Sequence, residues 1–159
     1  MAQECKECAE YLILIEDNRN YIGVKNKIRY IPQILMLYGY AIEVLIKAKL
    51  IEQKLLNYDK NGKLNSCAMG KINLHNCKQL LEKTGSIVKL DKKEETLLKN
   101  IQYFTELGKY PFMKCAANIE IEKERDRIKI IGITPPDDEV IEIIRRLYNK
   151  IYIEFKIKI

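Results

Sequence analysis

The sequence predicts an all-α protein, an up-and-down bundle of four to five main helices. Three observations lead to that prediction. The 159 residues contain only 7 Gly and 4 Pro, so few helix breakers interrupt the chain. Apolar residues recur at spacings of three and four over long stretches, which is the period of an amphipathic helix. The length fits a single domain, residues 1–159, because domains typically hold roughly 100–200 residues.

The first two expected helices cover residues 4–17 and 28–56. The first has an apolar face made of Cys5, Cys8, Leu12 and Ile15. The second carries two adjacent apolar stripes, so we expect it at the centre of the bundle, with Pro32 in its first turn. The polar run at residues 57–62 has the composition of a turn and should end this helix.

Three more helices are expected in the second half of the chain. A short one could be capped by Asn73 and closed by Gly85. The next should follow Asp91 and Glu94, which are spaced as an N-cap and its N3 partner. The last has an apolar face of Val140, Ile144, Leu147, Ile151 and Phe155. Residues 64–71 read as a linker with a possible helical turn, and residues 116–133 as a helix, a strand or a loop.

The net charge and the distribution of apolar residues indicate the cellular environment in which we expect the protein. The net charge of +6 is compatible with binding a nucleic acid, and equally with solubility alone. The first residues lack a basic leader, and the longest apolar stretch, residues 34–46, is shorter than the ~20 residues of a membrane span. We therefore expect a cytoplasmic protein with no membrane partner and with its five Cys reduced.

Two of those cysteines form a C-x-x-C motif, Cys5 and Cys8. A zinc site would need two more ligands, which Cys67, His75 or Cys77 could supply. The pair nevertheless falls on the apolar face of its helix, which favours two small core residues. The chain also lacks the glycine-rich nucleotide motifs and the nucleophile-elbow motif, so the sequence predicts neither a metal nor a cofactor.

Five polar residues are candidates for a functional site. Glu43 and Lys47 lie one turn apart in the most apolar helix, where they form either a structural ion pair or a polar site. His75, the only histidine, is a cap, a satisfied core residue or a proton-transfer group. Lys109 and Tyr110 follow a glycine, as an ordinary helix stop or as a phosphate-binding turn.

Three segments in this order resemble the HEPN family of helical domains. They are the glycine-aromatic and E-x-x-[LI]-K signature at residues 39–48, an H-[DN]-x-x-x-L helix start at 74–81, and a G-[RK]-Y-P turn at 108–111. The resemblance spans residues 36–112. HEPN domains are small helical bundles that commonly dimerise. Many are metal-independent ribonucleases of toxin–antitoxin and other defence systems, and others bind RNA without cutting it.

The ribonuclease members of that family carry an R-x(4–6)-H motif, which this chain lacks. The residues at the arginine positions before His75 are Ala68, Met69 and Gly70. The resemblance therefore implies an RNA- or nucleotide-associated homodimer, with a polar cluster formed by Glu43, Lys47, His75, Lys109 and Tyr110. In such a site the two lysines would contact phosphate, His75 would donate a hydrogen bond or move a proton, and Glu43 would orient Lys47.

Two other functions stay open on the sequence. One is a metal-independent endoribonuclease with a divergent site, in which His75 acts on the 2′-hydroxyl and a lysine stabilises the phosphate charge. The other is a non-enzymatic bundle that docks an antitoxin or another protein.

Overall fold

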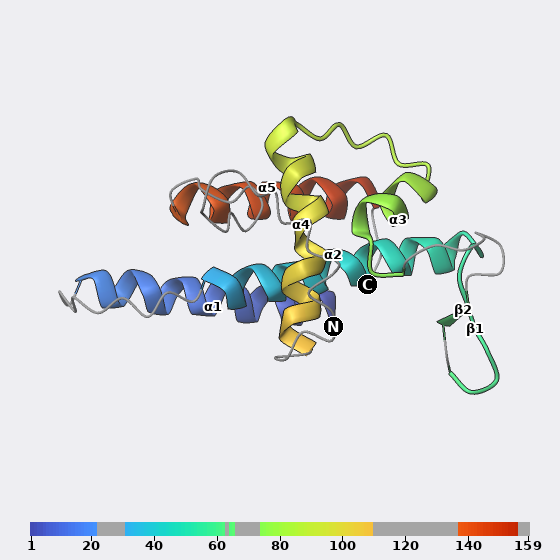
Figure 1. The fold of residues 1–159 in the computed structure, drawn as a ribbon, viewed down its shortest axis with the longest axis horizontal. Coiled ribbons are helices and arrows are strands. Elements are labelled where there is room, and N and C mark those ends of the chain that lie inside the picture. Colours follow the sequence, from blue (N-terminus) through green and yellow to red (C-terminus); the bar gives the residue numbers. More distant parts are fainter. Residues whose placement is uncertain (22–30, 63, 66–73, 110–136, 156–159) are drawn as a thin grey trace, which may run out of the picture.

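The structure is a computed structural model that describes residues 1–21, 31–62, 64, 65, 74–109 and 137–155. Five helices make up most of these residues (Figure 1): α1 (Ala2–Tyr21), α2 (Ile31–Glu52), α3 (Cys77–Lys83), α4 (Lys92–Lys109) and α5 (Asp137–Phe155). Within the same ranges the only strands are β1 (Asn57–Tyr58) and β2 (Leu64–Asn65). The expected all-α helical bundle is confirmed.

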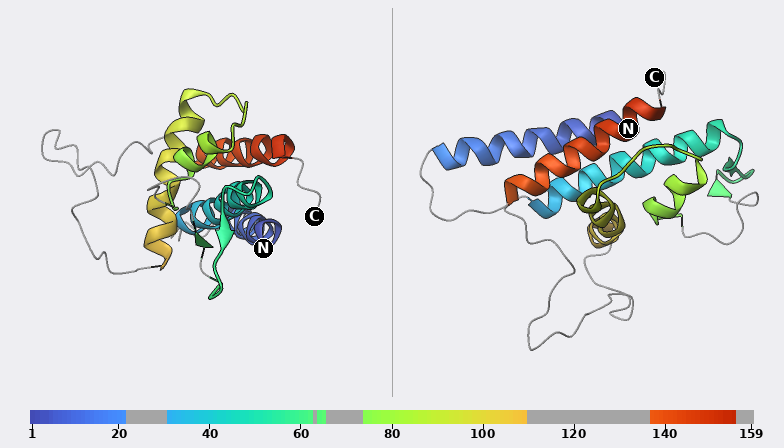
Figure 2. Two further views of the ribbon diagram at one scale, coloured as in Figure 1. Left: turned by 90° about the vertical axis from the view of Figure 1, so that its right-hand side faces the viewer. Right: turned by 90° about the horizontal axis from the view of Figure 1, so that it is seen from above.

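Helix α2 is the hub of the bundle, because it packs against α1, α3, α4 and α5. Figure 2 shows that α1, α2 and α5 run along one direction of the molecule and that α4 crosses them. Helices α1 and α2 lie side by side and run in opposite directions (Figure 1). The bundle therefore combines an aligned layer with one transverse helix.

The central position expected for α2 is also confirmed by burial. Leu35, Tyr38, Ile42 and Leu45, all from one predicted stripe, are at most 2% exposed. From the second stripe, Ile34 and Ala41 are fully buried, whereas Leu37 and Val44 are partly exposed. A helix with neighbours on several sides buries two stripes, as the pattern predicted.

Two expectations for the first helix were wrong. The helix does not end at residue 17, as expected, but continues to Tyr21, because helix propensity is only a weak preference. The buried face is also turned by about one residue from the predicted one. Ala9 and Ile13 are buried, Leu12 is partly buried at the flank, and Cys8 is exposed.

The cap of α3 differs from the prediction, and the cap of α4 agrees with it. The side chain of Asn76 accepts a hydrogen bond from the backbone N–H of Gln79 at 3.0 Å, so Asn76 is the N-cap and His75 lies just before the helix. Asn73 lies outside the described residues. Asp91 and Glu94 exchange two hydrogen bonds of 2.9 Å, which confirms the capping box of α4.

In the second half of the chain, the end of α3 and the buried face of α5 agree with the predictions from the sequence. Gly85 comes directly after the C-cap of α3 with a φ of +66°, as expected for a glycine that closes a helix. All five apolar residues predicted to face inward from α5 are at most 4% exposed.

The β1–β2 hairpin was not predicted. Its turn uses Asp59, which accepts hydrogen bonds from Asn61 and Gly62, and Gly62 has a φ of +72°. Leu64 and Asn65, expected to lie in a linker, form its second strand. In the described ranges, no helix has both the length and the apolar character that crossing a membrane requires.

Candidate functional site

Three of the five predicted site residues meet where α2 faces the segment before α3. Nζ of Lys47 lies 2.5 Å from Oε1 of Glu43, and Nδ1 of His75 lies 3.2 Å from the same oxygen. We call Glu43, Lys47 and His75 the Glu43 cluster. Lys109 is the last residue of α4, and its side chain and the whole of Tyr110 lie outside the described residues. The cluster therefore contains contacts between residues 32 positions apart in the sequence.

The local structure on both sides accounts for this meeting. Glu43 and Lys47 are one turn apart on α2, in the order that favours an ion pair. On the other side, the Asn76 cap starts α3 at Cys77, whose side chain is 1% exposed and packs in the core. The Asn76 cap and the buried Cys77 together hold His75, the residue before the cap, against α2.

Exposure differs strongly among the three side chains. Glu43 is 7% exposed, Lys47 is 19% exposed and His75 is 42% exposed. The carboxylate and the ammonium carry opposite charges, so the ion pair is neutral and its charge is not directed outward. His75 is thus the member of the cluster that an incoming molecule meets first.

The second oxygen of Glu43, Oε2, is buried and accepts no hydrogen bond from the described part of the chain. Leaving a charged acceptor without a partner in the interior costs roughly 1–3 kcal/mol or more. The cluster therefore has unused hydrogen-bonding capacity at its buried end, a property that purely structural ion pairs usually avoid.

Cys77 is a neighbour of the cluster that the sequence placed only in the core. Burial raises the pKa of its thiol to about 12, the negative charge of Glu43 adds to this effect, and Lys47 opposes it. The thiol therefore stays protonated at neutral pH, which makes it a poor nucleophile.

Helix α4 approaches α2 one turn before Glu43. The hydroxyl of Tyr40 donates to the backbone carbonyl of Thr105 at 2.9 Å. Gly39 lets the helices cross closely, because a Cβ there would meet methyl carbons of Ile101 and Thr105 at 2.8 Å. A glycine inside a helical pattern was the available signal for this close crossing.

Two ion clusters that the sequence did not reveal hold α5 in place. Arg145 donates to both carboxylate oxygens of Glu10 on α1, at 3.0 and 2.5 Å, and the hydroxyl of Tyr38 donates to the same carboxylate. The fully buried Glu94 accepts hydrogen bonds of 2.7 Å from Arg146 and Lys150. In both clusters, basic side chains of α5 pair with carboxylates of other helices, which indicates a structural role.

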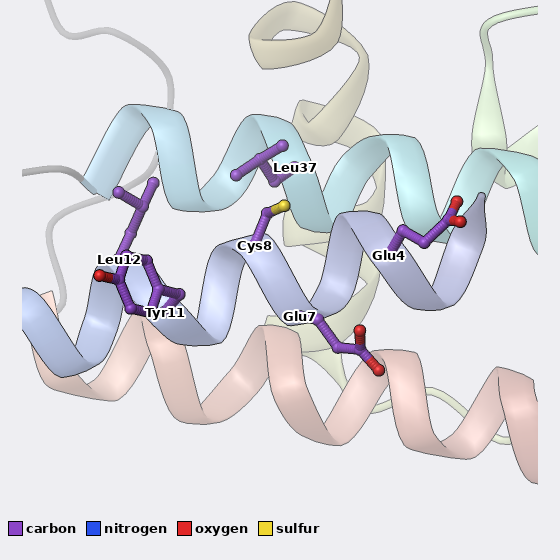
Figure 3. Close-up of a pocket in the computed structure, with 6 residues that line it drawn as sticks. All are labelled: Glu4, Glu7, Cys8, Tyr11, Leu12 and Leu37. Carbon is purple, nitrogen blue, oxygen red and sulfur yellow. The ribbon is translucent and has the colours of Figure 1, made fainter.

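The C-x-x-C motif lies beside a shallow groove of about 580 Å³ between α1 and α2 (Figure 3). The groove is lined by Glu4, Glu7, Cys8, Tyr11, Leu12 and Leu37. Figure 3 shows Cys8 directed toward Leu37, an apolar neighbour. Among the described residues, no three His, Cys, Asp or Glu side chains are grouped to hold a metal ion, and Cys67 lies outside those residues.

Comparisons of the chain with protein-family models, with curated proteins and with solved structures find no match.

Proposed function

We propose that this protein is a HEPN-like RNA- or nucleotide-associated protein of a bacterial defence or toxin–antitoxin-type system, without the usual ribonuclease motif. The observation that supports the proposal is the contact of His75 and Lys47 with one carboxylate oxygen of Glu43. Two segments that resemble the HEPN signature, residues 39–48 and 74–81, supply these three side chains. The proposal includes a cytoplasmic location and a homodimer.

The geometry of the Glu43 cluster refines the roles within this proposal. Lys47 is paired with Glu43 and is only 19% exposed, so it contributes little net charge to a phosphate. His75 is more than twice as exposed and becomes the main ligand-contacting residue. In the proposal Lys109 and Tyr110 bind the phosphate groups of the ligand. The net charge of +6 attracts the polyanion.

The experiment is binding of fluorescently labelled single-stranded and structured RNAs in EDTA, measured by anisotropy at two salt concentrations. We expect the wild type to bind and its affinity to fall as salt rises. Removal of one hydrogen bond to the ligand costs about 0.5–1.5 kcal/mol, so His75→Ala should weaken binding about two- to tenfold. His75→Ala is preferable to Lys47→Ala, which would leave Glu43 buried without its cation.

Lys60→Ala is the matched control, because Lys60 is an exposed residue in the hairpin turn, away from the cluster. It should leave the affinity within about twofold, since a single rim charge contributes little. A wild type that binds none of the RNAs at low salt would contradict the proposed function. In that case the non-enzymatic bundle that docks a protein partner, such as an antitoxin, becomes the better reading.

A second candidate function is metal-independent RNA cleavage. The observation that favours it is the buried carboxylate in contact with a histidine ring nitrogen, an arrangement that supports proton transfer. The same incubations, analysed on a sequencing gel, test it. RNA cut by the wild type in EDTA and left intact by His75→Ala would identify a ribonuclease, and intact RNA in both would leave binding alone.

A further inference from the structure

We infer that Glu43 is a positioning residue that holds His75 in the tautomer with its hydrogen on Nδ1, so that Nε2 is the hydrogen-bond acceptor of the ring. The ligand group that suits such a ring is a hydroxyl. The tautomer follows from the structure alone, whereas the ligand group rests on the proposed function.

The two contacts within the Glu43 cluster share one oxygen, Oε1 of Glu43. The Nζ ammonium of Lys47 can only donate hydrogen bonds, and it lies 2.5 Å from Oε1 of Glu43. Oε1 therefore acts as an acceptor and carries no hydrogen itself. Nδ1 of His75 lies 3.2 Å from this same oxygen, so the contact is a hydrogen bond only if Nδ1 provides the hydrogen.

In a neutral imidazole only one of the two nitrogens carries a hydrogen. With the hydrogen on Nδ1, the lone pair is on Nε2, which lies across the ring from Glu43. Exposure follows the same direction, from 7% for the Glu43 side chain to 42% for His75. The ring is thus anchored on Glu43 through Nδ1, while part of the His75 side chain is exposed to solvent.

A nitrogen that accepts a hydrogen bond can pair only with those groups of a nucleic acid that donate one. Phosphate oxygens only accept hydrogen bonds, so they do not suit a neutral ring with its lone pair on Nε2. The ribose 2′-hydroxyl can donate, and it is the group that distinguishes RNA from DNA. With its hydrogen on Nδ1 alone, His75 is therefore expected to contact ribose hydroxyls rather than phosphates and to favour RNA over DNA of the same sequence.

The tautomer can be measured directly, because His75 is the only histidine in the chain. Long-range ¹⁵N–¹H NMR of the labelled protein without RNA, at a pH where the titration shows the ring to be neutral, distinguishes the two nitrogens. We expect Nδ1 of the wild type to have the shift of a protonated nitrogen and Nε2 that of an unprotonated one. The opposite assignment in the wild type would overturn the inference.

Two variants separate Glu43 from its neighbours. Glu43→Gln replaces a group that only accepts with an amide that also donates, while Lys47 competes for its oxygen, so the population should shift toward the Nε2–H tautomer. Lys47→Arg keeps the cation and should leave the tautomer unchanged. A Glu43→Gln spectrum like that of the wild type, or loss of the Nδ1–H form in Lys47→Arg, would show that Glu43 does not set the tautomer. If Glu43→Gln does not fold, the wild-type and Lys47→Arg spectra still decide.

A second measurement tests the ligand group. RNA and DNA oligonucleotides of one sequence are compared with the wild type at low salt. One hydrogen bond to a hydroxyl should favour RNA by about two- to tenfold, and His75→Ala should lose this preference. Equal binding of RNA and DNA by the wild type would overturn the hydroxyl assignment. Absence of binding to both would contradict the proposed function, and the NMR result would still report on Glu43.

Discussion

Gly39 shows how one residue controls the crossing of two helices. It lies inside α2, where glycine is intrinsically unfavourable by roughly 1 kcal/mol relative to alanine. The close approach of Ile101 and Thr105 explains why a side chain is absent there. The sequence showed an isolated glycine in a helix but not its partner, because α4 comes about 60 residues later and crosses at an angle that periodicity does not encode.

Gly39→Ala should lower the free energy of unfolding by about 1–2 kcal/mol. Overpacking costs roughly 1–3 kcal/mol, and the better helix propensity of alanine offsets part of it. Urea unfolding measures the change. The double variant Gly39→Ala/Thr105→Ser removes one of the two clashing methyl carbons and should recover part of the loss. A single variant as stable as the wild type would show that the clash costs no more than the roughly 1 kcal/mol that alanine gains in helix propensity.

Glu94 makes the stability of the protein depend on pH in the acid range. Burial alone would raise the pKa of this carboxyl, but the hydrogen bonds from Lys150 and Arg146 outweigh burial and lower it. A carboxyl whose pKa is lower in the folded protein stabilises the fold fully above its ordinary value of about 4.3. That contribution is lost as the pH falls from there through the lowered value.

The free energy of unfolding should therefore fall as the pH drops below about 4, and less steeply in Glu94→Gln. At pH 7 the same variant should be less stable by about 1.5–3 kcal/mol, the range for hydrogen bonds to a charged group. Urea unfolding measured from about pH 2.5 to about pH 7, a range that includes the ordinary carboxyl pKa values, tests both effects. Glu52→Gln, a change in an exposed surface pair, is the control and should leave the slope as it is. Identical slopes for wild type and Glu94→Gln would contradict the role of Glu94.

At the scale of the helices, features that depend on neighbouring residues could be predicted from the sequence, whereas the rotation of α1 about its own axis could not. The capping box of α4, the glycine after α3 and the buried face of α5 were all readable, because each depends on residues within one or two turns. The buried face of α1 was predicted about one residue away from its position. Cys8 and Ala9 are both acceptable in a core, and only the packing against α2 decides between them.

The cap of α3 provides a test at this scale. Asn76→Ala removes the acceptor for the N–H of Gln79 and should cost about 1 kcal/mol, within a range of roughly 0.5–2. Hydrogen exchange of the Gln79 amide should accelerate in parallel. Asn76→Asp keeps an acceptor and should retain most of the stability. If the Gln79 amide exchanges at the same rate in Asn76→Ala, the cap does not start this helix.

At the scale of the whole molecule, the sequence predicted the class of fold and part of the candidate site. Glu43 and Lys47 were a readable pair because they share a helix face. Their meeting with His75 was expected only from the HEPN resemblance, since no local pattern reports a contact across 32 residues. The ion clusters of Arg145 and Arg146 were missed for the same reason, as their carboxylate partners lie on α1 and at the start of α4.

The position of α5 has a consequence for how the chain is made. Glu10 and Arg145 are 135 residues apart, and Tyr38 of α2 rests edge-on against Tyr148 of α5, with ring centroids 5.9 Å apart. A ribosome releases α1 and α2 long before it has synthesised residues 137–155. During that interval the apolar side of α2 that α5 covers in the folded protein is exposed, which makes the nascent chain prone to aggregation. Cotranslational folding can therefore begin with the first helical hairpin, but it is completed only when the last described helix has left the exit tunnel.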